Sequence, residues 1–200
     1  MGEGVLGRPC TRRDGALWCE GVPLHDIATG VGTPVYVYSA NALRERIRAL
    51  DAALAGVPHH IHYSLKANSS HGLLQVLRAE GCAADVVSAG ELMRAQRAGF
   101  APSEIIFGGV GKTRAEIRAG LQAGVKLLNI ESAAELAIVE DEARTLGIRA
   151  RIAFRVNPEV HVANAHQYIA TGSRGHKFGI PWGDVPRIAA MMLRLSIERV

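Results

Sequence analysis

The residue with the clearest potential for chemistry is Lys66, which directly follows a predicted strand over residues 61–65. Successive side chains of a strand point to opposite faces, so Lys66 shares a face with His62 and Ser64, away from the apolar residues between them. Lys66 then lies at the carboxyl end of its strand, where barrel enzymes keep their reactive groups. A lysine amine that is buried beside another cation loses its proton readily and becomes the nucleophile that forms a Schiff base with an aldehyde.

Two further charged residues are predicted to reach the same place. Arg155 lies near the carboxyl end of a predicted strand over residues 151–156, on the face opposite its apolar side chains, and Asp85 lies on a predicted strand over 84–87. The carboxyl ends of parallel strands meet at one mouth of a barrel, so Lys66, Asp85 and Arg155 are expected to converge there. Two interpretations of Arg155 stay open, a cation of the site or a structural ion-pair partner of Asp85.

The elements that must position these residues follow a regular order from residue 59 onward. Short apolar strands alternate with amphipathic helices, which predicts a parallel sheet, either doubly wound or closed as a barrel. The spacing favours a barrel, which needs eight such units over about 250 residues, so we expect this to be the front part of a longer protein. Strands are predicted at 61–65, 84–87, 105–107, 127–130, 151–156 and 196–200, and helices near 71–80, 89–98, 114–122, 132–146 and 184–194.

The amino-terminal segment has a different character, because it is rich in glycine and lacks the strand–helix alternation. Its apolar pattern predicts one strand at 16–20 and a second at 34–38. Ser39 or Asn41 can then cap a helix that runs to about residue 55, because their side-chain oxygens accept a hydrogen bond from an unpaired backbone N–H.

Composition excludes several classes of protein. The sequence has 200 residues, is 48% hydrophobic and 21% charged, and carries a formal charge of +4 from scattered basic residues, which gives no support to nucleic-acid binding. No apolar run approaches the length of a membrane span, and no signal peptide is visible. Cys10, Cys19 and Cys82 have unrelated spacings that predict neither a disulfide framework nor a zinc site. We therefore expect a cytoplasmic protein.

Two other signals for function were considered and set aside. Gly111-Lys112-Thr113 resembles the end of a nucleotide-binding P-loop, but Ile106 stands where that motif requires its first glycine. Histidines cluster near His60, and further ones lie at His161 and His166, but no carboxylate or cysteine accompanies them at ligand spacing, so no metal site is predicted.

Six motifs occur in an order that is typical of one family. They are Tyr63–Asn68 (YSLKAN), Ala84–Leu92 (ADVVSAGEL), Gly109–Thr113 (GVGKT), Arg155–Pro158 (RVNP), Tyr168–Gly172 (YIATG) and Lys177–Ile180 (KFGI). With these motifs the chain resembles the alanine-racemase-like, pyridoxal-phosphate-dependent decarboxylases, the class II family of ornithine, lysine, arginine and diaminopimelate decarboxylases with fold type III. The last three motifs are similar to the diaminopimelate decarboxylase branch.

The resemblance implies a fold and a set of site residues. It implies an incomplete (β/α)8 TIM barrel of the alanine-racemase type, in which residues 39–200 form the first part of the cofactor-binding barrel and residues 1–38 contribute strands to a separate β-domain. By the same resemblance Lys66 is the Schiff-base lysine of pyridoxal 5'-phosphate, and Asp85 and Arg155 line the cofactor pocket. Family members act as homodimers whose active site is completed across the interface.

The function implied is decarboxylation of meso-2,6-diaminopimelate to L-lysine and CO₂, in lysine biosynthesis. Alternatives are a decarboxylase of carboxynorspermidine, ornithine, arginine or a carrier-bound amino acid, and a non-catalytic homologue that binds a partner. A racemase is disfavoured by the motifs between residues 155 and 180. Ser64, Gln167 and Ala170 depart from the commonest family pattern. The family's remaining cofactor and substrate residues fall beyond residue 200, so residues 1–200 alone are expected to be inactive.

Overall fold

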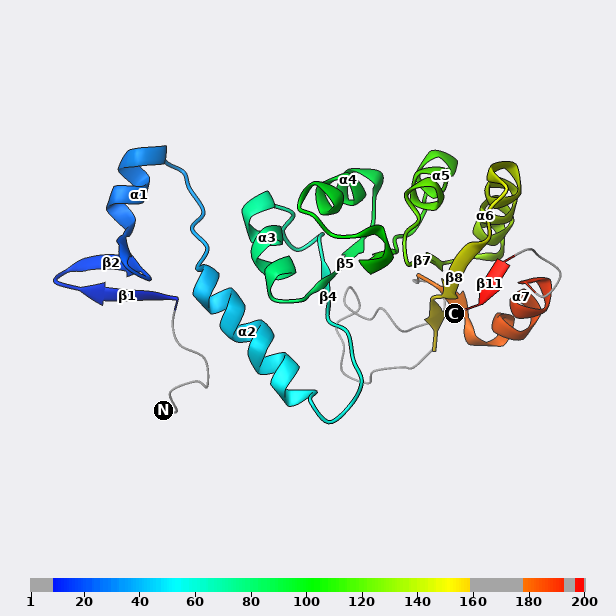
Figure 1. Cartoon of the computed structure of the whole chain (residues 1–200), viewed down its shortest axis with the longest axis horizontal. Coiled ribbons are helices and arrows are strands. Elements are labelled where there is room, and N and C mark those ends of the chain that lie inside the picture. The colour runs from blue at the N-terminus through cyan, green and yellow to red at the C-terminus, as the bar shows by residue number, and fades with distance from the viewer. Residues whose placement is uncertain (1–8, 159–177, 193–196, 200) are drawn as a thin grey trace, which may run out of the picture. The chain divides into compact units, whose positions relative to one another are not determined.

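The computed structural model describes residues 9–158, 178–192 and 197–199 (Figure 1). The chain divides into two compact units: the first comprises Met1–Ile61 with Ser70–Cys82, and the second comprises His62–Ser69 with Ala83–Val200. The predicted division between residues 38 and 39 refers to a separate β-domain and stays a prediction. Within the described residues, no helix combines the length and the apolar character that are needed to cross a bilayer.

The second unit is built on a parallel sheet whose strands are added in chain order. The order across the sheet is β11-β8-β7-β6-β5-β4, and every pairing is parallel. A doubly wound sheet reverses its strand order at a switch point, whereas a barrel adds each strand beside the preceding one. The observed order therefore confirms the predicted barrel type. The strands are β4 (His62–Ser64), β5 (Ala83–Val86), β6 (Ile105–Phe107), β7 (Leu127–Ile130), β8 (Ala150–Phe154) and β11 (Ile197–Arg199).

The helices of this unit begin and end at residues that the sequence marks clearly. The side-chain oxygens of Ser88, Thr113 and Ser132 each accept the backbone N–H of a glutamate three residues later, which satisfies an orphan donor of the helix. Gly124 and Gly147 end two of the helices in the left-handed conformation that glycine adopts without strain. The helices are α4 (Ala89–Arg97), α5 (Arg114–Ala123), α6 (Ala133–Leu146) and α7 (Val185–Met192), with 3-10 turns at Pro102–Glu104 and Trp182–Asp184.

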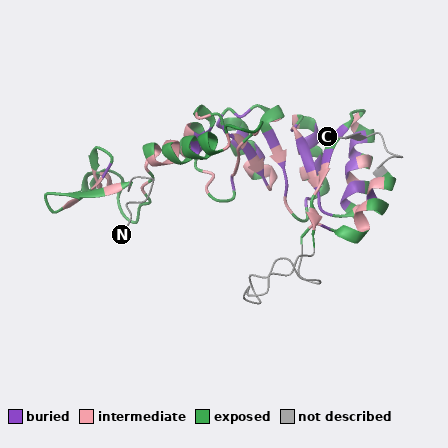
Figure 2. Ribbon diagram, turned by 90° about the horizontal axis from the view of Figure 1, so that it is seen from below, coloured by how far each residue is buried: buried purple, intermediate pink, exposed green. Residues whose placement is uncertain are grey.

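The alternation of strand residues divides buried from pocket-facing side chains. Val86 and Ile130 are fully buried, while Asp85, Val87 and Asn129 on the opposite face are only partly covered. Figure 2 shows the buried residues concentrated on the strands, with exposed residues on the outer faces of the helices. The faces predicted for the strands at 61–65 and 151–156 agree with this division, because Leu65 and Ile152 are buried whereas Lys66 and Arg155 are exposed.

Charged side chains join helices α5 and α6 beside this core. Arg114 and Arg118 both pair with the buried carboxylate of Glu142, at 2.7 and 2.5 Å, and Arg114 also pairs with Asp141 at 2.5 Å. Hydrogen bonds from Arg118 and then Arg114 hold the pKa of Glu142 below its ordinary value. The carboxylate is thus kept ionised and paired, as a buried charge requires.

The first unit begins with a small antiparallel sheet of β1 (Cys10–Arg13), β2 (Ala16–Cys19) and β3 (Val22–Pro23). The turn between β1 and β2 is Asp14-Gly15, and both residues have positive φ, which is the type I′ geometry that suits a two-residue hairpin. The helices of the unit are α1 (Leu24–Val31), α2 (Ala40–Ala53) and α3 (His71–Ala79).

Ser39 begins helix α2, as one of the two predicted caps. Its hydroxyl oxygen accepts the backbone N–H of Ala42 at 2.9 Å, and its own O–H donates to Glu20 at 2.7 Å. Glu20 also accepts from the backbone N–H of Asn41 at 2.8 Å. Hydrogen bonds from Asn41 and Ser39 lower the pKa of Glu20, so this carboxylate ties the end of β2 to the start of α2.

Two features of the first unit differ from the sequence prediction. The strand predicted over 34–38 is wrong, because no strand in the described part of the chain pairs with this segment, and Tyr36 and Tyr38 are 87% and 61% exposed. Apolar and aromatic residues favour strands only where a neighbour completes the ladder and covers a face. Helix α1 was not predicted, because its Thr and Gly residues have low helix propensity. Its apolar residues at Leu24 and Ile27 nevertheless have helical spacing.

Gly120, inside α5, gives a test of the packing between this helix and the sheet. A Cβ at Gly120 would lie 2.9 Å from the ring of Phe107 and 3.3 Å from Leu128, both fully buried. We expect Gly120→Ala to lower the free energy of unfolding of the full-length protein by about 1–3 kcal/mol, since overpacking outweighs the gain in helix propensity. Gly72→Ala, in α3, meets nothing within 4 Å and should be neutral or stabilising by up to about 1 kcal/mol. Urea denaturation of both variants measures the difference, and equal effects would contradict the packing.

Candidate functional site

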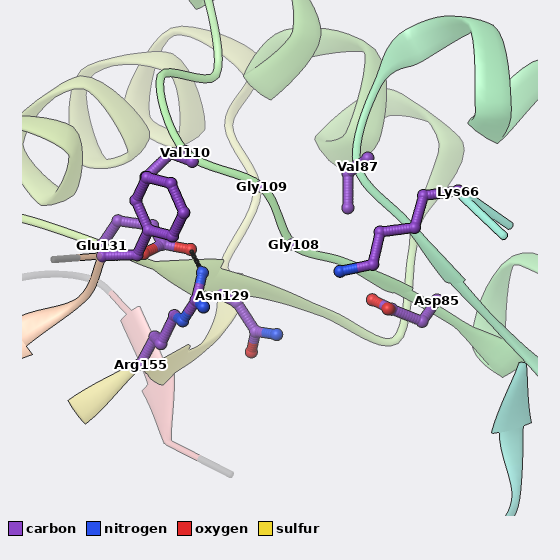
Figure 3. Close-up of a pocket in the computed structure, with 10 residues that line it drawn as sticks. Lys66, Asp85, Val87, Gly108, Gly109, Val110, Asn129, Glu131 and Arg155 are labelled. Carbon is purple, nitrogen blue, oxygen red and sulfur yellow. Dashed lines mark hydrogen bonds and ion pairs between the residues drawn. The ribbon is translucent and has the colours of Figure 1, made fainter. Parts of the chain in front are cut away.

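A cavity of about 510 Å³ opens at the carboxyl ends of strands β4 to β8 in the second unit (Figure 3). The position is the one at which barrels carry their sites, and the volume lies within the range of small-molecule pockets. The residues that line it are Lys66, Asp85, Val87, Gly108, Gly109, Val110, Asn129, Glu131, Arg155 and Phe178.

The structure brings the three predicted site residues, Lys66, Asp85 and Arg155, to this one pocket. Lys66 lies in a tight turn after β4. The buried Leu65 anchors the turn by donating its N–H to the Asp85 carbonyl at 2.9 Å, and Ala67 donates to Ser64 at 3.1 Å. Figure 3 shows the Lys66 side chain extended into the pocket on the same side as the Asp85 carboxylate. The predicted convergence at the strand ends is therefore observed.

Arg155 has a different partner from the one considered in the sequence. Its guanidinium donates to Glu131 at 2.9 Å, and the guanidinium carbon lies 5.4 Å from the centre of the Phe178 ring. Among the described residues Arg155 pairs with Glu131 and not with Asp85, so the proposed ion pair with Asp85 is wrong. Because Glu131 compensates its charge, Arg155 also does not act as the unpaired cation that the sequence argument placed beside Lys66.

The backbone holds Arg155 firmly on both sides. The predicted strand over 151–156 is interrupted at this residue, between β8 and β9 (Val156–Asn157). Its N–H donates to Ile130 at 3.0 Å, and its carbonyl accepts from Ile180, in β10 (Ile180–Pro181), at 2.7 Å. Gly179 has a φ of +91°, and a Cβ there would lie 2.7 Å from the Arg155 carbonyl, so only glycine permits this close approach.

Glu131 and Asn129 are pocket residues that the sequence analysis missed, and a repeat in the sequence points to them. Asp85–Leu92 (DVVSAGEL) and Asn129–Leu136 (NIESAAEL) share the same plan, each with a serine helix cap and a glutamate three residues later. In the first copy Glu91 accepts the Val87 N–H at 2.8 Å.

The second copy has the same local contact. Glu135 accepts the N–H of Glu131 at 2.7 Å, and the repeat thus gives β5 and β7 the same local geometry. A Cβ at Gly108, which directly follows the strand between them, would lie 3.5 Å from Asp85 Oδ1 and 3.6 Å from Asn129 Nδ2. Side chains from alternate strands therefore share one layer, as in other barrels.

Lys112 fixes the loop that passes between these two strands. Its ammonium donates to the carbonyls of Gly109 at 2.8 Å and Asn129 at 2.7 Å, and pairs with Glu135 at 2.6 Å. Its side chain is 1% exposed, so it points into the protein rather than toward a nucleotide phosphate. Gly109 has a φ of +98°, and a Cβ there would lie 2.8 Å from the Val87 carbonyl, so the loop depends on glycine as well as on the lysine.

Two buried oxygen atoms beside the pocket make no hydrogen bond with any described residue. One is Oε2 of Glu131, whose other oxygen pairs with Arg155, and the second is the hydroxyl of Ser64. A buried acceptor without a donor costs about 1–3 kcal/mol of stability. A bound ligand that donates a hydrogen bond to Glu131 Oε2 would remove this cost.

Histidines with protein partners in the described chain include His59 and His62. His59 Nε2 lies 3.0 Å from Asp51, and contacts with the Val57 carbonyl and then Asp51 raise the pKa of His59. His62 Nδ1 lies 3.3 Å from the Ala84 carbonyl oxygen. The described residues include no group of three or more His, Cys, Asp or Glu side chains arranged to hold a metal ion. His161 and His166, and the motif at 168–172 with the departures Gln167 and Ala170, lie outside the described residues, as does Lys177.

Comparison with known proteins agrees with this geometry. The family described as "Pyridoxal-dependent decarboxylase, pyridoxal binding domain" matches residues 40–199. The chain belongs to this family. The cofactor predicted from the sequence, pyridoxal phosphate, is therefore the one for which this domain is named.

Curated relatives that the chain matches include diaminopimelate decarboxylases from several bacteria. That of Vibrio cholerae is 43% identical over 192 residues, which cover 94% of this chain and 46% of the relative, and that of Pseudomonas fluorescens is 46% identical over 189 residues, covering 92% and 45%. The crystal structure of the M. jannaschii diaminopimelate decarboxylase with L-lysine is 31% identical, with a TM-score of 0.84, and the match covers 96% of this chain and 46% of that one. The chain thus spans less than half the length of the relatives it matches.

The buried pair of Lys112 and Glu135 gives a test of how the pocket is held. We expect Lys112→Met to lower the free energy of unfolding of the full-length protein by about 3–5 kcal/mol, because it leaves the Glu135 carboxylate buried without a counter-charge. Glu135→Gln added to Lys112→Met removes that charge while keeping an acceptor for the Glu131 N–H, and should restore a large part of the loss. A double-mutant cycle measured by urea denaturation checks this. Simple addition of the two single effects would show that the pair does not act as a unit.

Proposed function

We propose that this chain is the amino-terminal part of a decarboxylase that converts meso-2,6-diaminopimelate to L-lysine and CO₂ with pyridoxal phosphate. The observation that carries the proposal is the amine of Lys66, which enters a pocket at the carboxyl ends of parallel strands within the matched pyridoxal-binding domain. The substrate is supported by relatives of 39–46% identity that are named diaminopimelate decarboxylases. A related enzyme crystallised with L-lysine, the product proposed here, supports it further.

The pocket residues fit the cofactor. Lys66 is an exposed amine that can bond to an aldehyde, and the cavity volume of about 510 Å³ suits a small aromatic ring with its substituents. Gly108 presents no side chain between Asp85 and Asn129, which leaves room for a flat ring to approach the sheet. Lys66 would therefore hold the cofactor, with Asp85 and Arg155 in the surrounding wall.

Each side chain then has a separate task. When bound, pyridoxal phosphate supplies an aldehyde and an electron-withdrawing ring that accepts the electron pair left by departing CO₂. Lys66 binds the aldehyde through Nζ and, when released from it, holds a proton there for transfer. Asp85 places its carboxylate on the same side of the pocket as this amine. The pair of Glu131 and Arg155 forms the opposite wall, where its open carboxylate oxygen can accept a hydrogen bond from a ligand.

The proposal extends to the assembly and location of the protein. The complete enzyme is a homodimer whose active site is finished across the interface, as the resemblance implies. The reaction consumes and releases free amino acids, which supports the cytoplasmic location expected from the sequence. The alternative substrates carboxynorspermidine, ornithine and arginine serve as comparisons in the assay below.

The function is tested by Lys66→Ala in the full-length protein. We expect release of CO₂ from meso-2,6-diaminopimelate to fall by about 10²–10⁴-fold or more, because the amine that binds the cofactor and moves the proton is absent. The absorbance of the lysine-bound cofactor should also be lost. Borohydride reduction of the cofactor-loaded wild type, followed by peptide mapping, is expected to label Lys66.

Lys126→Ala is the matched control, because Lys126 does not line the pocket and its replacement should leave turnover unchanged. A label on another lysine would remove Lys66 from the mechanism. Faster release of CO₂ from ornithine or arginine than from diaminopimelate would keep the reaction class but overturn the substrate.

Residues 1–200 expressed alone are expected to be inactive and poorly stable. In the described part of the chain β4 and β11 each pair with one strand only, so an isolated fragment presents two open sheet edges. Calorimetry and gel filtration at micromolar concentration, together with the CO₂ assay, measure this. A cooperative unfolding transition from a monomer that also releases CO₂ would contradict it.

A further inference from the structure

Two cysteines of the first unit lie opposite each other, although their spacing in the sequence gave no reason to pair them. Strands β1 and β2 are antiparallel neighbours (Figure 1). Their register places Cys10 directly across from Cys19. Both thiols are free in the structure. Cys10 is partly exposed, whereas Cys19 is buried with 6% of its surface accessible.

The hairpin places the two thiols within bonding reach. The Asp14-Gly15 turn is closed by the pair Arg13 and Ala16, which is a hydrogen-bonded pair because it forms the i and i+3 positions of the turn. Hydrogen-bonded and non-hydrogen-bonded pairs alternate along an antiparallel ladder, so Cys10 and Cys19 form a non-hydrogen-bonded pair.

The Cα atoms of such a pair are about 4.5 Å apart, and their side chains leave the sheet on the same face. A disulfide requires a Cα separation of roughly 4.4–6.8 Å. The register of the hairpin therefore meets this requirement without movement of the backbone.

The two thiols differ in their exposure to solvent, and therefore in the step of an exchange reaction that each can perform. Burial raises the pKa of the Cys19 thiol, and contact with the Cys10 side chain raises it further. Cys19 is thus protonated and shielded at neutral pH, while Cys10 is open to a small reagent. An incoming reagent meets Cys10 first.

We propose that Cys10 and Cys19 are a thiol modification site that forms a reversible intramolecular disulfide by exchange with a small-molecule disulfide, for which glutathione disulfide is the probe. The Cys10 thiolate attacks one sulfur of the probe, a bond forms between them, and one glutathione thiolate leaves. Cys19 then loses its proton to water and attacks the Cys10 sulfur, which releases the second glutathione thiolate. The protein loses two electrons, and the probe is reduced to two thiols.

The crosslink would act on the junction between the hairpin and helix α2. Glu20 directly follows Cys19, and its carboxylate accepts hydrogen bonds from the Ser39 hydroxyl and the Asn41 N–H at the start of that helix. A bond between Cys10 and Cys19 fixes the open end of the hairpin beside this contact. A change in the position of Cys19 on oxidation would therefore be passed to the start of α2 through Glu20.

Trypsin provides a direct assay, because Arg12 and Arg13 lie between the two cysteines. The full-length protein is incubated with glutathione disulfide or with reduced glutathione, alkylated, and digested without reductant. The proposal predicts a linked pair of peptides, one ending at Arg12 and the other being Asp14–Arg44, lighter by two hydrogens than their sum. The linked pair should disappear after treatment with dithiothreitol.

Variants separate the two steps of the exchange. Cys19→Ser should retain glutathione on Cys10 as a mixed disulfide, whereas Cys10→Ser should leave Cys19 unmodified and alkylated only after unfolding. Cys82→Ser is the matched control, because Cys82 is also buried and burial raises its pKa, yet it should not change the yield of linked peptide.

Three results would overturn the proposal. The first is full alkylation of both cysteines after incubation with the oxidised probe and unfolding. The second is a mixed disulfide on wild-type Cys10 that does not resolve, and the third is a link between two copies of the Cys10 peptide.

Discussion

The ammonium group of Lys112 connects three separate parts of the second unit at one buried point. Its three donors are matched by the carbonyls of Gly109 and Asn129 and by the carboxylate of Glu135. A buried charge is tolerated only when such partners surround it, so the loop after β6, the end of β7 and the start of α6 must adopt the same relative positions together. Gly109 and Asn129 both line the pocket, so the contacts of Lys112 hold in place the part of its wall that lies between Lys66 and Arg155.

The repeat of Asp85–Leu92 in Asn129–Leu136 shows how the same scaffold carries different chemistry. In both copies the serine cap and the following glutamate fix the turn from strand to helix through equivalent hydrogen bonds. The positions that face the pocket differ: Asp85 corresponds to Asn129, and Val87 to Glu131. A glutamate therefore enters the site only in the second copy, where it can pair with Arg155.

The sequence predicts the second unit well because its information is local. Strand alternation, helix caps and strand order all depend on residues close in the chain, and they place Lys66, Asp85 and Arg155 correctly at one pocket. The strand predicted at 34–38 failed because a strand depends on a distant partner. Glu131 was missed because burial of its carboxylate depends on Arg155, which follows the next strand along the chain, although the repeat contained a usable signal.

The charged residues that line the pocket surround Lys66 differently from what the sequence argument assumed. The sequence argument relied on Arg155 as a cation that would favour the neutral amine of Lys66. The structure pairs Arg155 with Glu131 and places Asp85 on the side of Lys66, so two cations and two carboxylates line one cavity. The charge of Arg155 is balanced by the Glu131 carboxylate beside it, so the guanidinium is not an uncompensated cation facing the amine. What the protein contributes to Lys66 is position: a buried Leu65, a closed turn and a pocket open in front of the amine.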